Sequence, residues 1–311
     1  MSNKNKIRII TDSNSGITQS EAKDLNITVI PMPFTLNGEE YLEDVNITQD
    51  RFYEMLADGA DVKTSQPSQT YLEELWTDLL KDNDELVYIP MSSGLSGTCE
   101  NAKRYAANFN GKVFVVDNLR ISLSQKESVF EAIAMVKQGK SGKEIKEQLE
   151  RTKGKASIYI VLGVMKYLKR GGRISPAAAA LGDLLKLKPI LFTRGDKFEK
   201  FAITMGLKQA ERKIIDQFKK ELETEFKYDY EAGKMVVSTA YTKDSEEAIK
   251  FKEMLLAQFP KLKFHYVDPL SLSVSCHIGP GAVAACLCVN NYLSTTENWE
   301  LILSRFVKSN V

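Results

Sequence analysis

The feature that most constrains the fold is a pattern repeated through the first half of the chain: a β-branched run, a polar turn and a stretch of helical periodicity. Strand-like runs at residues 7–10, 27–34, 86–89 and 112–117 alternate with helix-like segments at 18–25, 47–59, 68–82 and 97–109. Thr48 and Ser68 stand where two of these helices need an N-cap. Strands separated by helices of this length favour a parallel sheet covered on both faces. We therefore predict a doubly wound α/β domain.

The pattern changes near residue 150, where a charged amphipathic helix ends at Gly154. Strand-like runs follow at residues 157–163, 188–194, 234–240, 262–268 and 282–289, with long helices at 206–226 and 244–258. We predict an N-terminal domain at residues 1–153 and a C-terminal mixed-sheet α/β domain at residues 154–311, with a ligand cleft between them.

Charge and hydropathy exclude several classes of partner. The 42 basic and 41 acidic side chains cancel to a net charge of +1 without a basic block, so nucleic acid is not an expected partner. The first residues, MSNKNKIRIITDS, lack the apolar core of a signal peptide, and no apolar stretch reaches membrane-spanning length. We expect a cytoplasmic protein without stable membrane insertion.

The four cysteines show no CxxC spacing and are expected to be reduced. Cys276, His277, Cys286 and Cys288 are residue types that bind zinc, but the small apolar neighbours in AVAACLCV suit a buried strand better. We therefore expect no metal site.

Four polar loops should share one edge of the predicted sheet: TDSNSG (11–16), KTSQPS (63–68), MSSGLSGT (91–98) and VDNLRIS (116–122). Ligands of open α/β sheets bind beyond the carboxyl ends of the strands, where loops lead into helix N-termini. Gly94 and Gly97 would let the backbone approach a ligand closely, and nearby hydroxyls would donate to an anion. The alternative is that these serines and threonines only cap helices and turns.

The second half contributes cationic candidates. YLKRGGRIS (167–175) places Lys169, Arg170 and Arg173 around a double glycine, which suits an anion-binding nest but also a helix end with solvated bases. CHIGPGAVA (276–284) places His277 on a Gly-Pro-Gly turn, whereas His265 lies within a strand pattern.

In order along the chain, TDS, TSQPS, SSGLSGT, LKRGGRIS, KPIL and HIGPGA closely resemble the DegV family of bacterial fatty-acid-binding proteins, which includes the FakB carrier subunits of fatty acid kinase. The resemblance implies that a long-chain fatty acid lies between two α/β domains, that no other cofactor is needed, and that a separate kinase subunit phosphorylates the carboxylate. It also implies the carboxylate-binding residues: Thr64, Ser65, Ser93, Ser96, Arg173 and His277. Two stretches depart from the family pattern, NLRISLSQ (118–125) and Gly16.

Two other functions fit parts of the pattern. GLSGT resembles the nucleophile elbow GxSxG of serine hydrolases, and Ser96, His277 and one of the aspartates would form the triad, although Thr98 stands in the place of the last glycine. A helix N-terminus with serines also suits an enzyme that acts on a small phosphorylated metabolite. A Walker-type sequence GxxxxGK[ST] does not occur in the chain.

Overall fold

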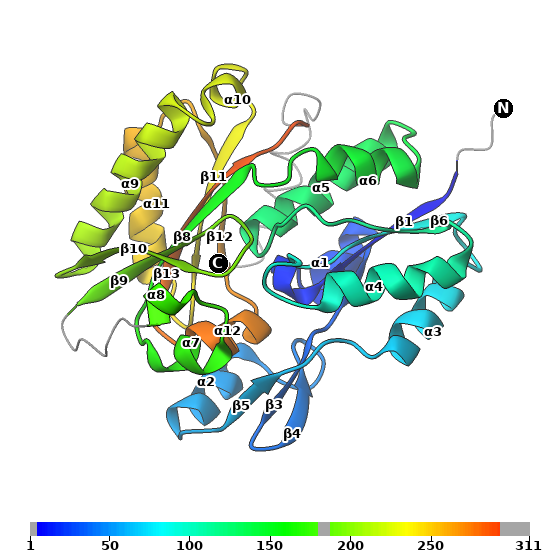
Figure 1. Ribbon diagram of the computed structural model, residues 1–311, viewed down its shortest axis with the longest axis horizontal. Helices are drawn as coiled ribbons and strands as arrows, with labels where there is room; N and C mark the ends of the chain where they lie inside the picture. The colour runs from blue at the N-terminus through cyan, green and yellow to red at the C-terminus, as the bar shows by residue number, and fades with distance from the viewer. Residues whose placement is uncertain (1–4, 180–186, 293–311) are drawn as a thin grey trace.

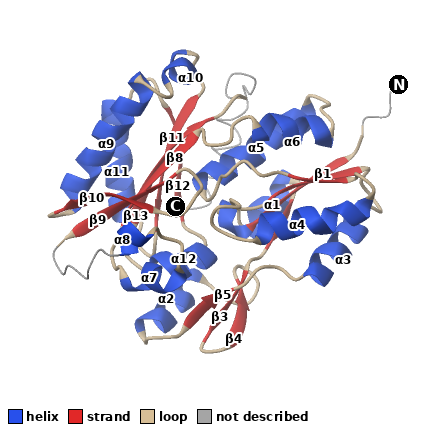
Figure 2. Ribbon diagram, in the orientation of Figure 1, coloured by secondary structure: helices blue, strands red, loops and turns tan. Residues whose placement is uncertain are grey.

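The computed structural model describes residues 5–179 and 187–292, which form three sheets with helices packed around them (Figure 1). The last nineteen residues of the predicted C-terminal domain, 293–311, lie outside the described residues. The three sheets are a four-stranded parallel sheet, a small three-stranded antiparallel sheet and a six-stranded mixed sheet (Figure 2).

The predicted N-terminal parallel sheet is confirmed, with strand order β2-β1-β6-β7. Its strands are β1 (Ile7–Asp12), β2 (Thr28–Ile30), β6 (Glu85–Ile89) and β7 (Val113–Val115). Alternate side chains cover opposite faces, so Ile9 and Val87 join one apolar cluster whereas Ile10 and Leu86 join another. The helices that supply the rest of these clusters are α1 (Gln19–Leu25), α3 (Gln69–Leu79), α4 (Thr98–Ala106), α5 (Leu123–Lys137) and α6 (Gly142–Glu150).

The strand predicted at residues 27–34 is instead two strands in two different sheets. Pro31 and Pro33 lack the backbone N–H that a continuous ladder requires, and the chain leaves the parallel sheet there. The antiparallel sheet, in the order β4-β3-β5, consists of β3 (Pro33–Leu36), β4 (Glu39–Leu42) and β5 (Val62–Thr64). With α2 (Gln49–Ala57), capped by the Thr48 side chain as predicted, these strands form what we call the small unit.

The predicted C-terminal mixed sheet is confirmed as six strands in the order β10-β9-β8-β13-β11-β12, with only β11 and β12 parallel. The strands are β8 (Ala156–Val161), β9 (Lys188–Thr193), β10 (Glu199–Thr204), β11 (Met235–Tyr241), β12 (Lys263–Pro269) and β13 (Val283–Val289). Cys286 and Cys288 lie buried on β13, as the AVAACLCV pattern predicted. One face packs on α9 (Leu207–Glu223) and α11 (Glu246–Gln258) (Figure 1).

The remaining elements are short: α7 (Lys166–Gly171), α8 (Pro176–Ala179), α10 (Lys227–Glu231), α12 (Leu272–Ile278) and the 3-10 helices η1 (Ser13–Ser15) and η2 (Ala107–Phe109). Within residues 5–179 and 187–292, no helix combines the length and the apolar character that crossing a bilayer requires.

Helix α5 joins the two halves of the molecule. It lies between the parallel sheet and the six-stranded sheet and contacts β1 on one side and β13 on the other (Figure 1). Twelve of its fifteen residues are buried. Apolar side chains such as Phe130 pack against the face of the six-stranded sheet that lies opposite α9 and α11. This shared apolar layer surrounds the site described next.

Candidate ligand-binding site

A cavity of about 390 Å³ is lined by residues from the part of the chain that forms the parallel sheet, from the small unit and from the part that forms the six-stranded sheet. Its volume lies within the range of about 300–1,000 Å³ that small-molecule sites have. Five of the six predicted carboxylate-binding residues line it: Thr64, Ser65, Ser96, Arg173 and His277. The loops that carry them are separated by up to about two thirds of the sequence, and the fold brings them to one end of the cavity.

Thr64 and His277 are hydrogen-bonded to each other. Thr64 ends β5 of the small unit, and its Oγ1 lies 2.9 Å from Nε2 of His277 in the last turn of α12. Burial, together with the positive charge of Arg173, lowers the pKa of His277 to about 4. The imidazole is therefore neutral at neutral pH and can complete a hydrogen-bonding pair with the threonine hydroxyl.

The small unit also holds α12 in place through two further hydrogen bonds. Oε2 of Glu43 accepts from the Leu272 N–H at the start of α12, at 2.9 Å. The Tyr53 hydroxyl donates to Oγ of Ser275, at 3.0 Å. Because α12 carries His277, these contacts position one wall of the polar end of the cavity.

Ser96 precedes α4 and is tied to the first turn of that helix. Its Oγ lies 2.9 Å from Oγ1 of Thr98 and accepts from the Thr98 N–H at 3.2 Å. The N-cap residue of α4, Gly97, has no side chain to cap the helix and lines the cavity. The predicted helix N-terminus with a nearby hydroxyl is therefore present at the polar end.

Arg173 supplies the positive charge at this end. Its Nη1 donates to the carbonyl of Gly171 at 2.6 Å, and its Nε lies 3.4 Å from the carbonyl of Leu95. These contacts hold the guanidinium between the two halves of the molecule, and its five N–H groups allow it to donate to a ligand as well. Lys169 and Arg170, the other two predicted cations, are exposed and lie outside the cavity lining.

Three details of the predicted site are different in the structure. Ser93 does not line the cavity. Gly94 faces the turn at Gly195 and Asp196 rather than a ligand, whereas Gly97 does line the cavity. His277 lies in α12, just before the Gly-Pro-Gly turn rather than on it.

The serine hydrolase alternative is not supported by the geometry. Ser96 is hydrogen-bonded to Thr98, and the hydroxyl that reaches the imidazole of His277 belongs to Thr64. A nucleophile needs its base within hydrogen-bond reach, and Ser96 and His277 have no such bond in the described structure.

Sequence reasoning missed three polar residues of the lining: Asn14, Gln66 and Ser273. Asn14 and Gln66 belong to two of the predicted loops, so their loops but not their roles were predictable. Ser273 donates to Oδ1 of Asn14 at 2.7 Å, and nothing in its local sequence marks it, because its position depends on how α12 packs.

Asp12 organises the loops without reaching the cavity. Its buried carboxylate accepts from the Met91 N–H at 2.8 Å, the Asn14 N–H at 3.1 Å and Nε2 of Gln125 at 3.1 Å. Burial raises the pKa of Asp12 even though these donors act to lower it. This carboxyl group therefore ties together the loops after β1 and β6 and the helix α5.

The other end of the cavity is apolar. The apolar residues in the lining are Met32, Met91, Leu95, Leu168 and Phe198, of which Phe198 also lines the next cavity. A second, smaller cavity of about 30 Å³ follows, lined by Leu123, Ile160, Ala240, Leu270 and Cys286 among others. Ile121, Phe198, Val274 and Ile278 line both cavities. The site is thus polar and cationic at one end and apolar at the other.

A match to a family model shows which protein family the chain belongs to. Residues 6–290 match the model of the DegV family, which is described as a family of uncharacterised proteins. The chain belongs to the DegV family. The DegV domain-containing protein SA1258 of Staphylococcus aureus (strain N315) is 30% identical over 275 residues, which is 88% of this chain and 96% of that protein.

Two solved DegV structures with the same fold are described as binding fatty acids. The protein from Thermus thermophilus has a TM-score of 0.81 and 28% identity, with 91% of this chain and 99% of that chain covered. The protein from Bacillus subtilis has a TM-score of 0.79 and 28% identity, with 92% and 99% covered.

Five of the six DegV motifs meet at the cavity. The TDS, TSQPS, SSGLSGT, LKRGGRIS and HIGPGA segments, or the residues directly next to them, each contribute lining residues, whereas KPIL forms the start of β9 and does not. These motifs are far apart in the sequence but close together in the fold.

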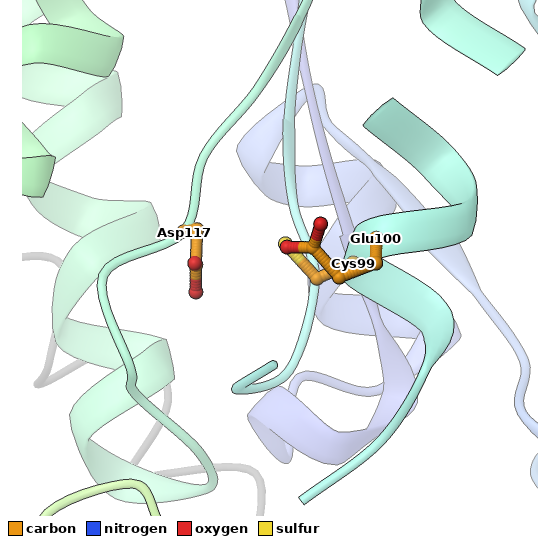
Figure 3. Close-up of side chains that lie close together, drawn as sticks. All are labelled: Cys99, Glu100 and Asp117. Atoms are coloured by element: carbon orange, nitrogen blue, oxygen red, sulfur yellow. The ribbon is translucent and has the colours of Figure 1, made fainter. Parts of the chain in front are cut away.

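A separate group of side chains has the composition of a metal site. Cys99 and Glu100 at the start of α4 face Asp117 in the loop after β7 (Figure 3). Nζ of Lys103 already lies 2.7 Å from Glu100 and 3.2 Å from Asp117, and Lys153 lies 3.1 Å from Asp117. Burial raises the pKa of the Cys99 thiol to about 12, which disfavours the thiolate that binds metals. The group is an ion-pair network rather than an open set of ligands.

Proposed function

We propose that this protein binds a long-chain fatty acid between its two halves and presents the carboxylate to a separate ATP-dependent kinase subunit, which converts it to an acyl phosphate. One observation carries the proposal: a cavity that has hydroxyl, imidazole and guanidinium groups at one end continues into an apolar chamber at the other. The fatty-acid binding described for DegV relatives of the same fold supports it.

The two ends of the cavity have different roles in this proposal. A buried carboxylate without hydrogen-bond donors is very costly, so Thr64, Ser96 and Arg173 would compensate for its lost hydration. Each buried methylene contributes about 0.8 kcal/mol, so a sixteen-carbon chain contributes on the order of 10 kcal/mol before ordering costs. The tail would therefore supply affinity and the head group orientation.

We propose a carrier rather than an enzyme because the sequence has no Walker-type nucleotide motif. Ser65 and Gln66 are exposed and line the polar end, so a partner protein can approach the carboxylate there. Incubation of the protein with fatty acid and ATP should yield no acyl phosphate until the ATP-binding subunit of a fatty acid kinase is added. Acyl phosphate formed by the protein alone would contradict the carrier role.

The direct test of binding is an organic extract of the purified protein, analysed by mass spectrometry. We expect a fatty acid in a ratio approaching one per chain. An extract without lipid, together with binding of a sugar phosphate to the same site, would instead support an enzyme for a small phosphorylated metabolite. Release of product from an activated ester would support a hydrolase.

The head-group assignment has a matched control in the same loop. Ser96→Ala combined with Thr64→Val should weaken fatty-acid binding by about a hundredfold, because two hydrogen bonds to a charged group are lost. Ser93→Ala removes a hydroxyl from the same loop that does not line the cavity, so it should leave the affinity unchanged. Equal losses in both variants would contradict the assignment.

A further inference from the structure

A short stretch of backbone, residues 119–123, leads into α5 and borders the apolar chamber. Ile121 lines both cavities, and Ser122 and Leu123 line the inner one. The inner cavity of about 30 Å³ has room for about two water-sized groups. An acyl chain that enters from the polar end and fills the inner cavity therefore packs against residues 121–123, which we call the end wall.

The backbone of the end wall does not follow local preference. Leu119 and Ser122 have φ angles of 55° and 54°, and Ser122 combines this with a ψ of −130°. Side chains disfavour that region, which turns usually fill with glycine. A segment with these angles keeps its shape only if surrounding contacts hold it.

Arg120 supplies the strongest of these contacts. Its guanidinium is fully buried and donates to the carbonyl of Val289 at 2.8 Å and to Oγ of Ser128 at 3.1 Å, and Nη1 lies 3.3 Å from Oε2 of Glu131. Its carbonyl accepts from the Ser92 N–H at 2.8 Å. One residue thus joins the end wall to β13, to α5 and to the loop at residues 91–98, which we call the serine loop.

Ser124 fixes the next residue of the wall. Its hydroxyl donates to the carbonyl of Ile121 at 2.8 Å and accepts from the Ile121 N–H at 3.2 Å. The Ser122 carbonyl accepts from the Lys126 N–H at 2.9 Å, which is a helical bond of α5. Ile121 and Ser122 are therefore both hydrogen-bonded to residues of α5, and Leu123 begins that helix, so the wall cannot move independently of α5.

We propose that Arg120 positions residues 121–123 as a rigid end wall, and that this wall sets the upper limit of acyl chain length that the site accepts. The inference rests on the proposed fatty-acid binding. A chain that fits gains affinity with each methylene, by about fourfold. A longer chain must displace the wall and break the buried contacts of Arg120, so its affinity falls.

The test is a binding series with dodecanoic, tetradecanoic, hexadecanoic and octadecanoic acids. The wild-type protein should show an optimum, with weaker binding of the acids beyond it. Ser122→Gly removes the conformational conflict at this position and should fold at least as well as the wild type, yet it loosens the wall. Leu123→Ala deepens the chamber directly. Both variants should move the optimum toward longer chains by about two carbons.

Arg120→Lys tests the positioning role itself. Lysine keeps the charge but cannot make the forked set of bonds, so we expect a flatter length profile as well as lower stability. Leu149→Ala creates a comparable cavity in α6, away from the site, and should lower stability without moving the optimum. Ser96→Ala should weaken all four acids by the same factor.

An unchanged optimum in Ser122→Gly and Leu123→Ala, with fatty acids still bound, would overturn the end wall and leave the proposed function intact. Failure of the wild-type protein to bind any of the four acids would instead remove the proposed function, and the inference with it.

Discussion

At the scale of single residues, the polar end of the cavity depends on a glycine that makes room for a ring. A Cβ at Gly171 would overlap the imidazole of His277. Gly171→Ala should therefore displace the ring from Thr64 and weaken fatty-acid binding about tenfold, the effect of one hydrogen bond to a charged group. Calorimetric titration with hexadecanoate measures this.

The matched control is Gly206→Ala. Gly206 has an extended backbone with a φ of 168°, and nothing lies within 4 Å of the position of its Cβ. We expect unchanged affinity there. If Gly171→Ala bound as tightly as the wild type, His277 would have no part in holding the ligand.

Glu43 should make stability depend on pH. Burial raises the pKa of this carboxyl group from 4.5 to about 8, and the negative charge of Asp44 contributes to the increase. The hydrogen bond from the Leu272 N–H acts in the opposite direction but is the smaller effect. Tyr53 and Cys276 also face this carboxyl group. The folded protein keeps the proton up to about pH 8, whereas the unfolded chain loses it near pH 4.5, so the free energy of unfolding falls as pH rises through this window.

Urea unfolding at pH 5, 7 and 9 tests this, since one pKa unit corresponds to about 1.4 kcal/mol. Glu43→Gln has no proton to lose and should show a flatter pH profile while keeping an acceptor for the Leu272 N–H. Identical profiles for the variant and the wild type would show that Glu43 ionises normally.

At the scale of elements, the turn between β9 and β10 fits against the serine loop and contributes to the site. The Ser92 hydroxyl donates to the carbonyl of Gly195, and Phe198 just after the turn lines both cavities. Phe198 also donates from its N–H to the carbonyl of Arg173 at 2.9 Å. The turn therefore couples the loop that carries Ser96 to the segment that carries Arg173.

Gly94→Ala should separate these elements. A Cβ at Gly94 would lie 2.5 Å from the carbonyl oxygen of Gly195 and 2.8 Å from Cα of Asp196, both backbone atoms that cannot rotate away. We expect a loss of about 2 kcal/mol of stability, typical of overpacking, measured by thermal unfolding. Gly97→Ala is the control, because its nearest neighbour would lie at 3.6 Å; equal loss in the two variants would contradict the close fit.

The sequence allowed most elements to be predicted, because their periodicity and caps are local properties. Thr48 and Ser68 cap α2 and α3 as expected. The small sheet was not predicted, because β5 has only three residues and its pairing with β3 spans almost thirty positions. Helix α5 also escaped prediction: it is buried on nearly all sides and so lacks an amphipathic pattern.

At the scale of the whole molecule, buried charges on α5 join the two halves. Nζ of Lys126 lies 2.8 Å from Asp268 on β12 and 3.3 Å from Glu21 on α1. Burial opposes ionisation, but the two carboxylates raise the pKa of Lys126. The lysine thus remains charged and bridges elements that are far apart in the sequence.

Lys126→Met should leave these carboxylates uncompensated and cost about 3 kcal/mol of unfolding free energy. Lys250→Met removes an exposed lysine that pairs with Glu246 and Glu247 on α11, and it should cost less than about 0.5 kcal/mol. Guanidinium denaturation measures both. A Lys126 variant as stable as the Lys250 variant would show that this ion-pair group does not hold the halves together.

The composition of the site was predictable, but its geometry was not. Ser96, Arg173 and His277 were recognised from glycine-rich and basic motifs, whose chemistry can be read locally. Thr64 was expected on the parallel sheet but reaches the cavity from the small unit, and Ser93 lies in the expected loop but does not line the cavity. The direction in which a loop side chain points depends on tertiary packing, which cannot be predicted from the local sequence pattern.

The most direct test of the account is a crystal structure of the protein with hexadecanoate. We predict that the carboxylate lies within hydrogen-bond distance of Thr64 and Ser96, next to Arg173, and that the chain passes between Phe198 and Ile278 to end against Leu123. A head group at the inner end of the chamber, or a ligand bound outside this cavity, would contradict the account.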